Sequence, residues 1–124
     1  MKITCGTDII EIHRIKEDIE NIGGEFLNRI FTQKEIQYCE SKKKQKYQHY
    51  AARFAAKEAV FKAISHQLEN KFSIAWKDIE ITNDENGRPN VEVLGINTTD
   101  INNIDISLSH CKEYAVANVT ILYK

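Results

Sequence analysis

The sequence predicts one α+β domain in which one long helix and several short helices pack against an antiparallel sheet. Three observations lead to this prediction. The chain has 124 residues, enough for a single hydrophobic core, and it shows no linker or internal repeat. Apolar residues recur at helical spacing through most of its first half. Its last third consists of short apolar stretches separated by turn residues, which is typical of antiparallel strands. We therefore treat residues 1–124 as one domain.

The first half of the chain predicts one strand followed by helical segments. Residues 3–10 alternate well enough to form a strand. The residues that follow at helical spacing, up to a pair of glycines, are Ile12, Ile15, Ile19 and Ile22. A short helical segment covers residues 25–30, and Thr32 with Glu35 has the pattern of a capping box that begins the next helix. Residues 47–67 form the longest predicted helix, because they are rich in Ala, Lys and Glu.

The second half predicts two hairpins. Strands at residues 77–82 and 90–94 flank a turn-rich loop, and Pro89 is tolerated at the start of an edge strand. Strands at residues 104–109 and 114–123 flank a short turn.

The last of these strands is apolar on both faces. One face carries Ala115, Ala117, Val119 and Ile121, and the other carries Tyr114, Val116 and Leu122. Such a strand is covered on both sides. Either it is the fully buried central strand of its sheet, or a second copy of the chain covers one face. A chain this short has little material for both faces, which points to an oligomer.

Composition excludes several classes of protein. Hydrophobic residues make up 42% of the chain, too many for a disordered protein. Lys plus Arg total 17 and Asp plus Glu total 18, so a nucleic-acid-coating protein is not expected. No apolar stretch is long enough to span a membrane, and the opening residues MKITCGTDII are a poor secretory signal. The three cysteines suggest neither a disulfide framework nor a zinc site, so we expect the protein in the cytoplasm.

Two acidic residues stand in apolar surroundings, where an unpaired charge would be costly. On a helical wheel, Glu58 lies between Phe54 and Phe61, inside the apolar arc of the long helix. Asp8 is embedded in the apolar first strand, before Ile9. If the two carboxylates meet, a cation between them relieves their repulsion. Mg²⁺ suits this role, because it takes one or two carboxylates together with water and phosphate oxygens.

Basic residues on the same helix, Arg53, Lys57 and Lys62, would then face those phosphates. Purely structural alternatives exist for each acid. Glu58 could pair with Lys62 at i,i+4 on a wet helix surface, and Asp8 could cap the helix that follows it.

Five blocks of sequence carry a resemblance to a known family. They are GTDIIEI at 6–12, FT at 31–32 with Glu35, RFAAKEA at 53–59, WKDIEI at 76–81 with GRP at 87–89, and SLSH at 107–110 with YAVA at 114–117. In order and spacing they resemble the holo-acyl-carrier-protein synthases, the small trimeric class of 4'-phosphopantetheinyl transferases. The resemblance covers residues 3–119 and implies that family's fold, assembled as a trimer.

The resemblance implies a reaction. Such enzymes transfer the 4'-phosphopantetheine group of coenzyme A to a serine of apo-acyl carrier protein in fatty acid biosynthesis, and they release adenosine 3',5'-bisphosphate. Asp8 and Glu58 would be the magnesium ligands, and Lys62 would neutralise the pyrophosphate of coenzyme A. Their site would lie between neighbouring subunits of a homotrimer, which agrees with the doubly apolar last strand.

The remaining assignments also come from the resemblance. Arg53 and His110 would lie by the 3'-phosphate, with Lys57 as a further phosphate contact, although His110 could instead be an ordinary turn residue. Arg14 would dock the acidic carrier protein, or be an ordinary exposed helix residue, and Arg29 is a weaker docking candidate. The base that takes the serine proton stays open between Glu58 and a metal-bound water, with His110 less favoured.

The sequence departs from the family in two places. Residues 65–71 contain no glycine, where the family has a glycine-rich loop that approaches coenzyme A closely, and Thr7 replaces an aliphatic residue. Three other classes of function therefore stay in view. They are a coenzyme A-binding trimer without catalysis, an unrelated magnesium-dependent phosphoryl-transfer enzyme, and a structural oligomer. The second would need a phosphate-binding motif such as GxxxxGK[ST], which the chain lacks.

Overall fold

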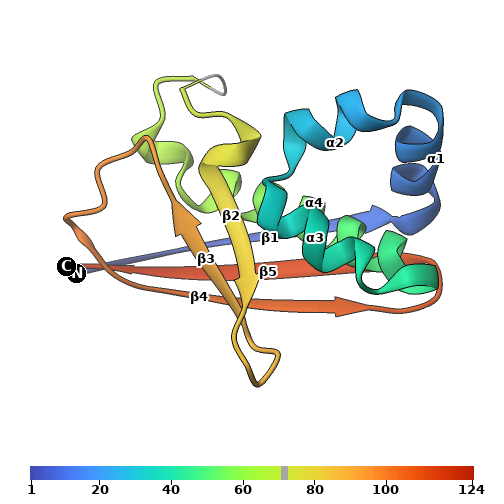
Figure 1. Ribbon diagram of the computed structural model, residues 1–124. Coiled ribbons are helices and arrows are strands. Elements are labelled where there is room, and N and C mark those ends of the chain that lie inside the picture. Colours follow the sequence, from blue (N-terminus) through green and yellow to red (C-terminus); the bar gives the residue numbers. More distant parts are fainter. Residues whose placement is uncertain (71–72) are drawn as a thin grey trace.

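The central helix of the fold lies across a long antiparallel sheet (Figure 1). The computed structural model describes residues 1–70 and 73–124. Within them, β1 (Lys2–Glu11), β5 (Tyr114–Tyr123) and β4 (Ile101–His110) form a sheet in the order β1-β5-β4. A separate hairpin pairs β2 (Ile79–Asn83) with β3 (Pro89–Val93). The predicted α+β class with an antiparallel sheet is confirmed, and both predicted hairpins form.

Four α-helices and three 3-10 turns complete the described chain. They are α1 (Ile12–Ile22), α2 (Gly24–Ile30), α3 (Gln33–Glu40), η1 (Lys43–Gln45), α4 (Lys46–Ala63), η2 (Ser65–Gln67) and η3 (Trp76–Asp78). Helix α4 packs against β1 and β5 on one side and against α1, α3 and β2 on others, so it is the central element (Figure 1). It ends four residues earlier than the sequence predicted, because the chain tightens into η2 after Ile64.

The local signals near the helix starts and strand ends are confirmed. Thr32 caps α3 as a capping box: its backbone N–H donates to Glu35 Oε1 at 2.8 Å, and its hydroxyl accepts from the Glu35 N–H at 3.3 Å. Pro89 is the first residue of β3 and pairs with Asn83, the last residue of β2. At this end of the hairpin its missing N–H interrupts no hydrogen bond between the interior residues of the two strands. The strand predicted at residues 77–82 begins at Ile79, because η3 occupies the preceding residues.

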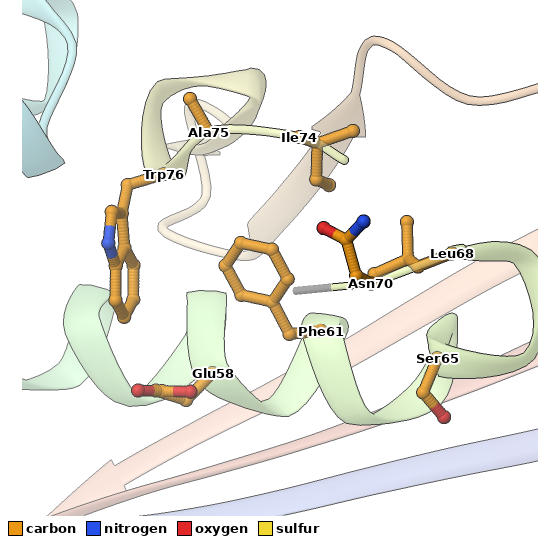
Figure 2. A pocket seen from close by; sticks show the side chains of 8 residues that line it. All are labelled: Glu58, Phe61, Ser65, Leu68, Asn70, Ile74, Ala75 and Trp76. Carbon is orange, nitrogen blue, oxygen red and sulfur yellow. The ribbon is translucent and has the colours of Figure 1, made fainter. Parts of the chain in front are cut away.

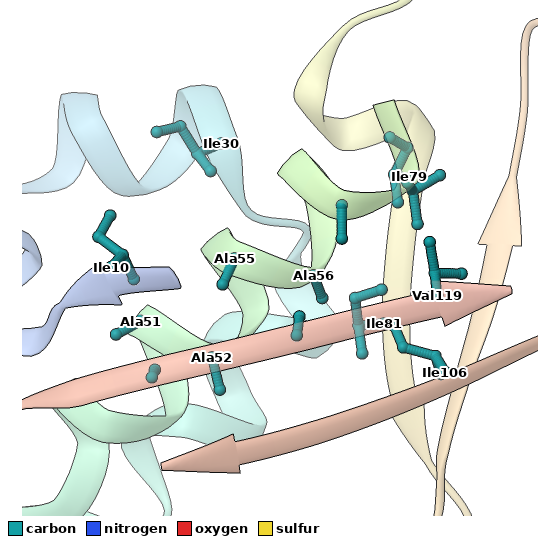
Figure 3. Packing of buried hydrophobic residues seen from close by; sticks show 14 of the residues in the cluster. Ile10, Ile30, Ala51, Ala52, Ala55, Ala56, Ile79, Ile81, Ile106 and Val119 are labelled. Atoms are coloured by element: carbon teal, nitrogen blue, oxygen red, sulfur yellow. The ribbon is translucent and has the colours of Figure 1, made fainter. Parts of the chain in front are cut away.

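The core face of α4 is made of small side chains. Its fully or almost fully buried alanines are Ala51, Ala52, Ala55, Ala56, Ala59 and Ala63. They let the helix approach the inward side chains of β5, which include the buried Val119, and Figure 3 shows this packing together with Ile79, Ile81 and Ile106. Close packing of this kind leaves no room for added methyl groups.

The opposite face of the long sheet is open in the single chain. Ile3 and Ile9 of β1 are 66% and 64% exposed, and Tyr114 of β5 is 43% exposed. Thr7 lies on the same face, and its hydroxyl accepts a hydrogen bond from Asn118 Nδ2 at 2.7 Å. β5 is therefore the central strand, as one alternative held, but only its inner face is covered within one chain.

Candidate active site

Asp8 is brought to α4 by the way β1 packs. Gly6, Asp8 and Ile10 alternate toward the inner face of the sheet, and Asp8 stands opposite Ala117 of β5. A Cβ on Gly6 would lie 1.9 Å from the Ala59 carbonyl oxygen, so only glycine permits this approach of strand to helix. Asp8 follows two residues later, and its side chain is 19% exposed. It lies within β1, so it does not cap α1; that position is held by Glu11.

Glu58 and Lys62 face Asp8 from α4. The Lys62 ammonium donates to Asp8 Oδ1 at 3.2 Å and to the Thr7 carbonyl oxygen at 2.8 Å, so its ion pair is with Asp8. Burial raises the pKa of Glu58, the nearby Asp8 carboxylate raises it further, and Lys62 opposes both effects. The structure thus brings together the three side chains expected at the centre of the site.

Two cavities meet at Glu58. A polar cavity of about 360 Å³ is lined by Asp8, Ile9, Ile10, Glu11, Arg14, Phe54, Glu58 and Tyr114. A larger, mainly apolar cavity of about 660 Å³ is lined by Glu58, Phe61, Ser65, Leu68, Asn70, Ile74, Ala75 and Trp76 (Figure 2). The Trp76 ring stacks on Phe54 with centroids 5.0 Å apart and meets Phe61 edge-on at 5.4 Å. Glu58 therefore sits between a polar opening and an aromatic wall.

Arg53 of α4 and His110, the last residue of β4, belong to a basic cluster apart from the Asp8 and Glu58 carboxylates. The Arg53 side chain is buried: it donates to Asn83 Oδ1, and its guanidinium carbon lies 4.1 Å from the centre of the Tyr38 ring. Its Nε has no hydrogen-bond partner within the described part of the chain. His49 joins the cluster, with its ring 6.2 Å from that of His110 and 5.6 Å from that of Tyr38.

The electrostatics of this cluster favour an anion. Burial, followed by the positive charges of Arg53, Lys42 and His110, lowers the pKa of His49 to about 4. Sequence analysis missed His49 as a member of the cluster. The one available signal was helical spacing, because His49 lies four residues before Arg53 on α4.

A sequence profile of the 4'-phosphopantetheinyl transferase superfamily matches residues 4–119. The chain belongs to this superfamily. It is 48% identical, over 98% of its length and 92% of the relative, to the holo-[acyl-carrier-protein] synthase of Ruminiclostridium cellulolyticum. It is 44% identical to that of Protochlamydia amoebophila, over 94% of this chain and 95% of the relative.

Solved structures of the superfamily share the whole fold. A Bacillus anthracis holo-(acyl-carrier-protein) synthase in complex with CoA (3',5'-ADP) matches with a TM-score of 0.81 and 33% identity, over 98% of this chain and 96% of that one. The Helicobacter pylori synthase in complex with coenzyme A matches with a TM-score of 0.82 and 28% identity, over 95% and 99%. The fold implied by the five sequence blocks is confirmed.

Lys57, which the resemblance suggested as a phosphate contact, is enclosed in the core. Its side chain is fully buried, 2.8 Å from Glu35 Oε1, and it donates to the carbonyl oxygens of Trp76, at 3.1 Å, and Ile79. Burial lowers the pKa of Lys57, and the Glu35 carboxylate opposes this effect. Because this ammonium is enclosed with three oxygen partners, we do not propose a phosphate contact for Lys57.

The structure also locates Arg14, the residue predicted to dock the carrier, and the loop that lacks glycine. Arg14 is exposed on α1 and lines the same polar cavity as Asp8 and Glu58. The glycine-free loop is held by Gln67, which donates to the Asn97 carbonyl oxygen at 3.0 Å and accepts from the Tyr123 hydroxyl at 2.6 Å. Lys71, the last residue of that loop, lies outside the described residues.

The described residues contain no group of three or more His, Cys, Asp and Glu side chains that could hold a metal ion by themselves. A pair of carboxylates is what they offer, at Asp8 and Glu58. None of the described helices has the length and apolar character needed to cross a membrane.

Proposed function

We propose that this chain is a holo-[acyl-carrier-protein] synthase. It transfers the 4'-phosphopantetheine group of coenzyme A to a serine of apo-acyl carrier protein, in fatty acid biosynthesis. The observation that supports this most is that Asp8 and Glu58 line one cavity and Lys62 is paired with Asp8, in a chain that is 48% identical to a protein of that name.

The reaction is a displacement at phosphorus. The serine oxygen forms a bond to the phosphorus that bears the pantetheine arm. The bond from that phosphorus to the bridging oxygen breaks, and this oxygen leaves as part of adenosine 3',5'-bisphosphate. Lys62 is suited to the leaving oxygen, because its side chain is 54% exposed and its ammonium lies beside Asp8. Glu58, whose pKa is raised, is suited to accept the serine proton, and a water molecule remains the alternative.

Asp8 and Glu58 fit a divalent cation. The Asp8 carboxylate raises the pKa of Glu58, and one lysine nearby leaves the site short of positive charge. Mg²⁺ with water and phosphate oxygens as its other ligands matches this donor set. When bound, Mg²⁺ would neutralise charge on the pyrophosphate.

The basic cluster fits the 3'-phosphate of coenzyme A. Arg53 supplies a buried positive charge whose Nε has no partner within the described residues, and the His49 ring lies 6.2 Å from that of the exposed His110. A phosphate there would find charge and hydrogen-bond donors together. Arg14, at the rim of the polar cavity, is suited to an acidic carrier protein approaching Asp8 and Glu58.

A homotrimer would complete the site. The exposed Ile9 and Tyr114 both line the polar cavity and both belong to the open side of β1 and β5. A second copy that covers this apolar face would therefore also border the cavity. Light scattering on the purified chain is expected to give three times the mass of one chain.

Intact-mass measurement of an apo-acyl carrier protein tests the function. With coenzyme A and Mg²⁺, the carrier should gain one phosphopantetheine group, and chelation of Mg²⁺ should abolish the gain. Glu58→Gln should keep the trimer and lose most of the transfer, because one metal ligand loses its charge. Glu92→Gln, which removes an exposed carboxylate from β3, is the matched control.

The possible outcomes separate the alternatives. An unchanged carrier mass with coenzyme A still bound would identify a binding module without catalysis. Full transfer by Glu58→Gln would mean that Glu58 is not a required metal ligand.

A further inference from the structure

A buried ion pair lies directly behind the proposed active site. Lys57 and Glu35 are both without solvent exposure, and Lys57 Nζ lies 2.8 Å from Glu35 Oε1. Burying two charges requires removing their water, so such a pair is weak evidence for stability, and apolar residues of similar volume often serve as well. The presence of the pair is therefore better explained by the groups that it holds in place than by its own contribution to stability.

The hydrogen bonds of Lys57 and two of those that Glu35 accepts are with backbone groups, and Lys57 Nζ also lies 5.8 Å from the centre of the Phe31 ring. Glu35 Oε2 accepts from the Ile81 N–H at 2.8 Å, and Oε1 accepts from the Thr32 N–H at 2.8 Å. Lys57 donates to the Trp76 and Ile79 carbonyl oxygens. The pair thus fastens the segment that runs from η3 into β2 onto α3 and α4.

The segment that is fastened carries the aromatic wall beside Glu58. Trp76 stacks on Phe54 with an interplanar angle of 24° and meets Phe61 at 81°. Phe54 and Phe61 precede and follow Glu58 by about one helical turn. Figure 2 shows Glu58 projecting from α4 beneath the Trp76 ring, with Phe61 beside them. Adjacent residues of α4 therefore do two tasks: Lys57 holds the Trp76 backbone, and Glu58 lies under its ring.

We propose that Lys57 and Glu35 are positioning residues for the transfer reaction, which hold Trp76 against Phe54 and Phe61 and so keep the apolar side of the Glu58 site in its working shape. This inference rests on the proposed function. Neither residue touches substrate: they act through Trp76. Loss of the pair should lower kcat while leaving carrier docking, for which Arg14 is proposed, unchanged.

The double variant Lys57→Met with Glu35→Gln tests this inference, because it removes the pair without leaving a lone buried charge. Trp76 is the only tryptophan of the chain, so its fluorescence reports its own surroundings. A red-shifted emission with easier quenching by acrylamide is expected in the folded variant. With a displacement of the wall by about 1 Å, kcat should fall roughly 10- to 100-fold at an unchanged KM for the carrier. Lys77→Met, an exposed lysine next to Trp76, is the matched control and should change neither quantity.

Wild-type emission and wild-type kcat in the folded double variant would overturn the inference. If the double variant does not fold, Trp76→Ala and Trp76→Phe replace it, since both leave the pair intact. Trp76→Phe should stay near wild-type kcat because it keeps a ring on Phe54, and Trp76→Ala should lose activity; equal activity of the two overturns the inference. A wild-type chain that transfers nothing refutes the proposed function instead, and the emission of the double variant still reports whether the pair holds Trp76.

Discussion

Gly6→Ala is the perturbation that tests most directly how the fold brings Asp8 and Glu58 together. A Cβ at this position would lie 1.9 Å from the carbonyl oxygen of Ala59, 2.9 Å from its carbonyl carbon and 3.2 Å from the Ala63 nitrogen. All three atoms belong to the backbone of α4, so no side chain can rotate away to relieve the contact.

The size of the effect follows from these distances. Real Cβ atoms essentially never come within 3.0 Å of a non-bonded heavy atom. Raising the distance to the Ala59 carbonyl oxygen from 1.9 Å to 3.0 Å would therefore require β1 and α4 to separate by 1.1 Å. Overpacking a core costs about 1–3 kcal/mol, and a shift of backbone places this substitution at the upper end. Asp8 follows Gly6 by two residues and Glu58 precedes Ala59, so the same separation would spread the two carboxylates. A displacement near 1 Å can lower the rate by about 100-fold.

Two measurements on the full chain check this prediction: the melting temperature, and the rate of carrier modification by intact mass. Gly24→Ala is the control, because an added Cβ at the start of α2 would meet only Asn28 Nδ2, at 3.9 Å. Gly6→Ala should melt lower and transfer more slowly, while Gly24→Ala should do neither. Wild-type melting and transfer in Gly6→Ala would refute the packing argument, and a lower melting temperature with unchanged transfer would separate the packing from the site.

Two further predictions concern charges around the site. Lys62→Ala should lower kcat more than it weakens binding of the carrier, because its ammonium stands beside Asp8 where the leaving oxygen is proposed to lie; the reverse pattern in steady-state kinetics would assign Lys62 to docking. The second prediction concerns stability between pH 7 and pH 5. His49 has a pKa of about 4 when folded, below the 6.5 of an unfolded histidine, so the unfolded state binds more protons in this window and stability falls as the pH falls. His49→Phe should therefore lose less melting temperature from pH 7 to pH 5 than the wild type does; an equal loss in the two would contradict the assignment.

Local features of the fold were predictable because their causes are local. The capping box of Thr32 and Glu35 satisfies backbone donors within four residues, and the alternation of β5 follows from the two-residue period of a strand. The five blocks of sequence gave the family and its fold. Asp8 and Glu58 stood out because each carries a charge within an apolar stretch, and no knowledge of distant residues was needed to notice this.

The burial of the charges on α4 was not predictable in the same way. The helical wheel placed Glu58 inside the apolar arc, and Lys57 was expected to face phosphates, yet Glu58 is half-buried at a cavity and Lys57 is fully enclosed. The core face of the helix is its alanine face, which a wheel weighted by large apolar residues does not favour.

The amino-acid sequence by itself determined the elements, the family and the pair of acids, because periodicity, capping and motif order are properties of neighbouring residues. Only the tertiary structure decided which charges are enclosed and which stay open. Lys57 is enclosed because Glu35 and the backbone of Trp76, from two other segments, supply its partners. Whether a charge can be buried depends on partners that another part of the chain brings to it, and no local pattern records where those partners will be.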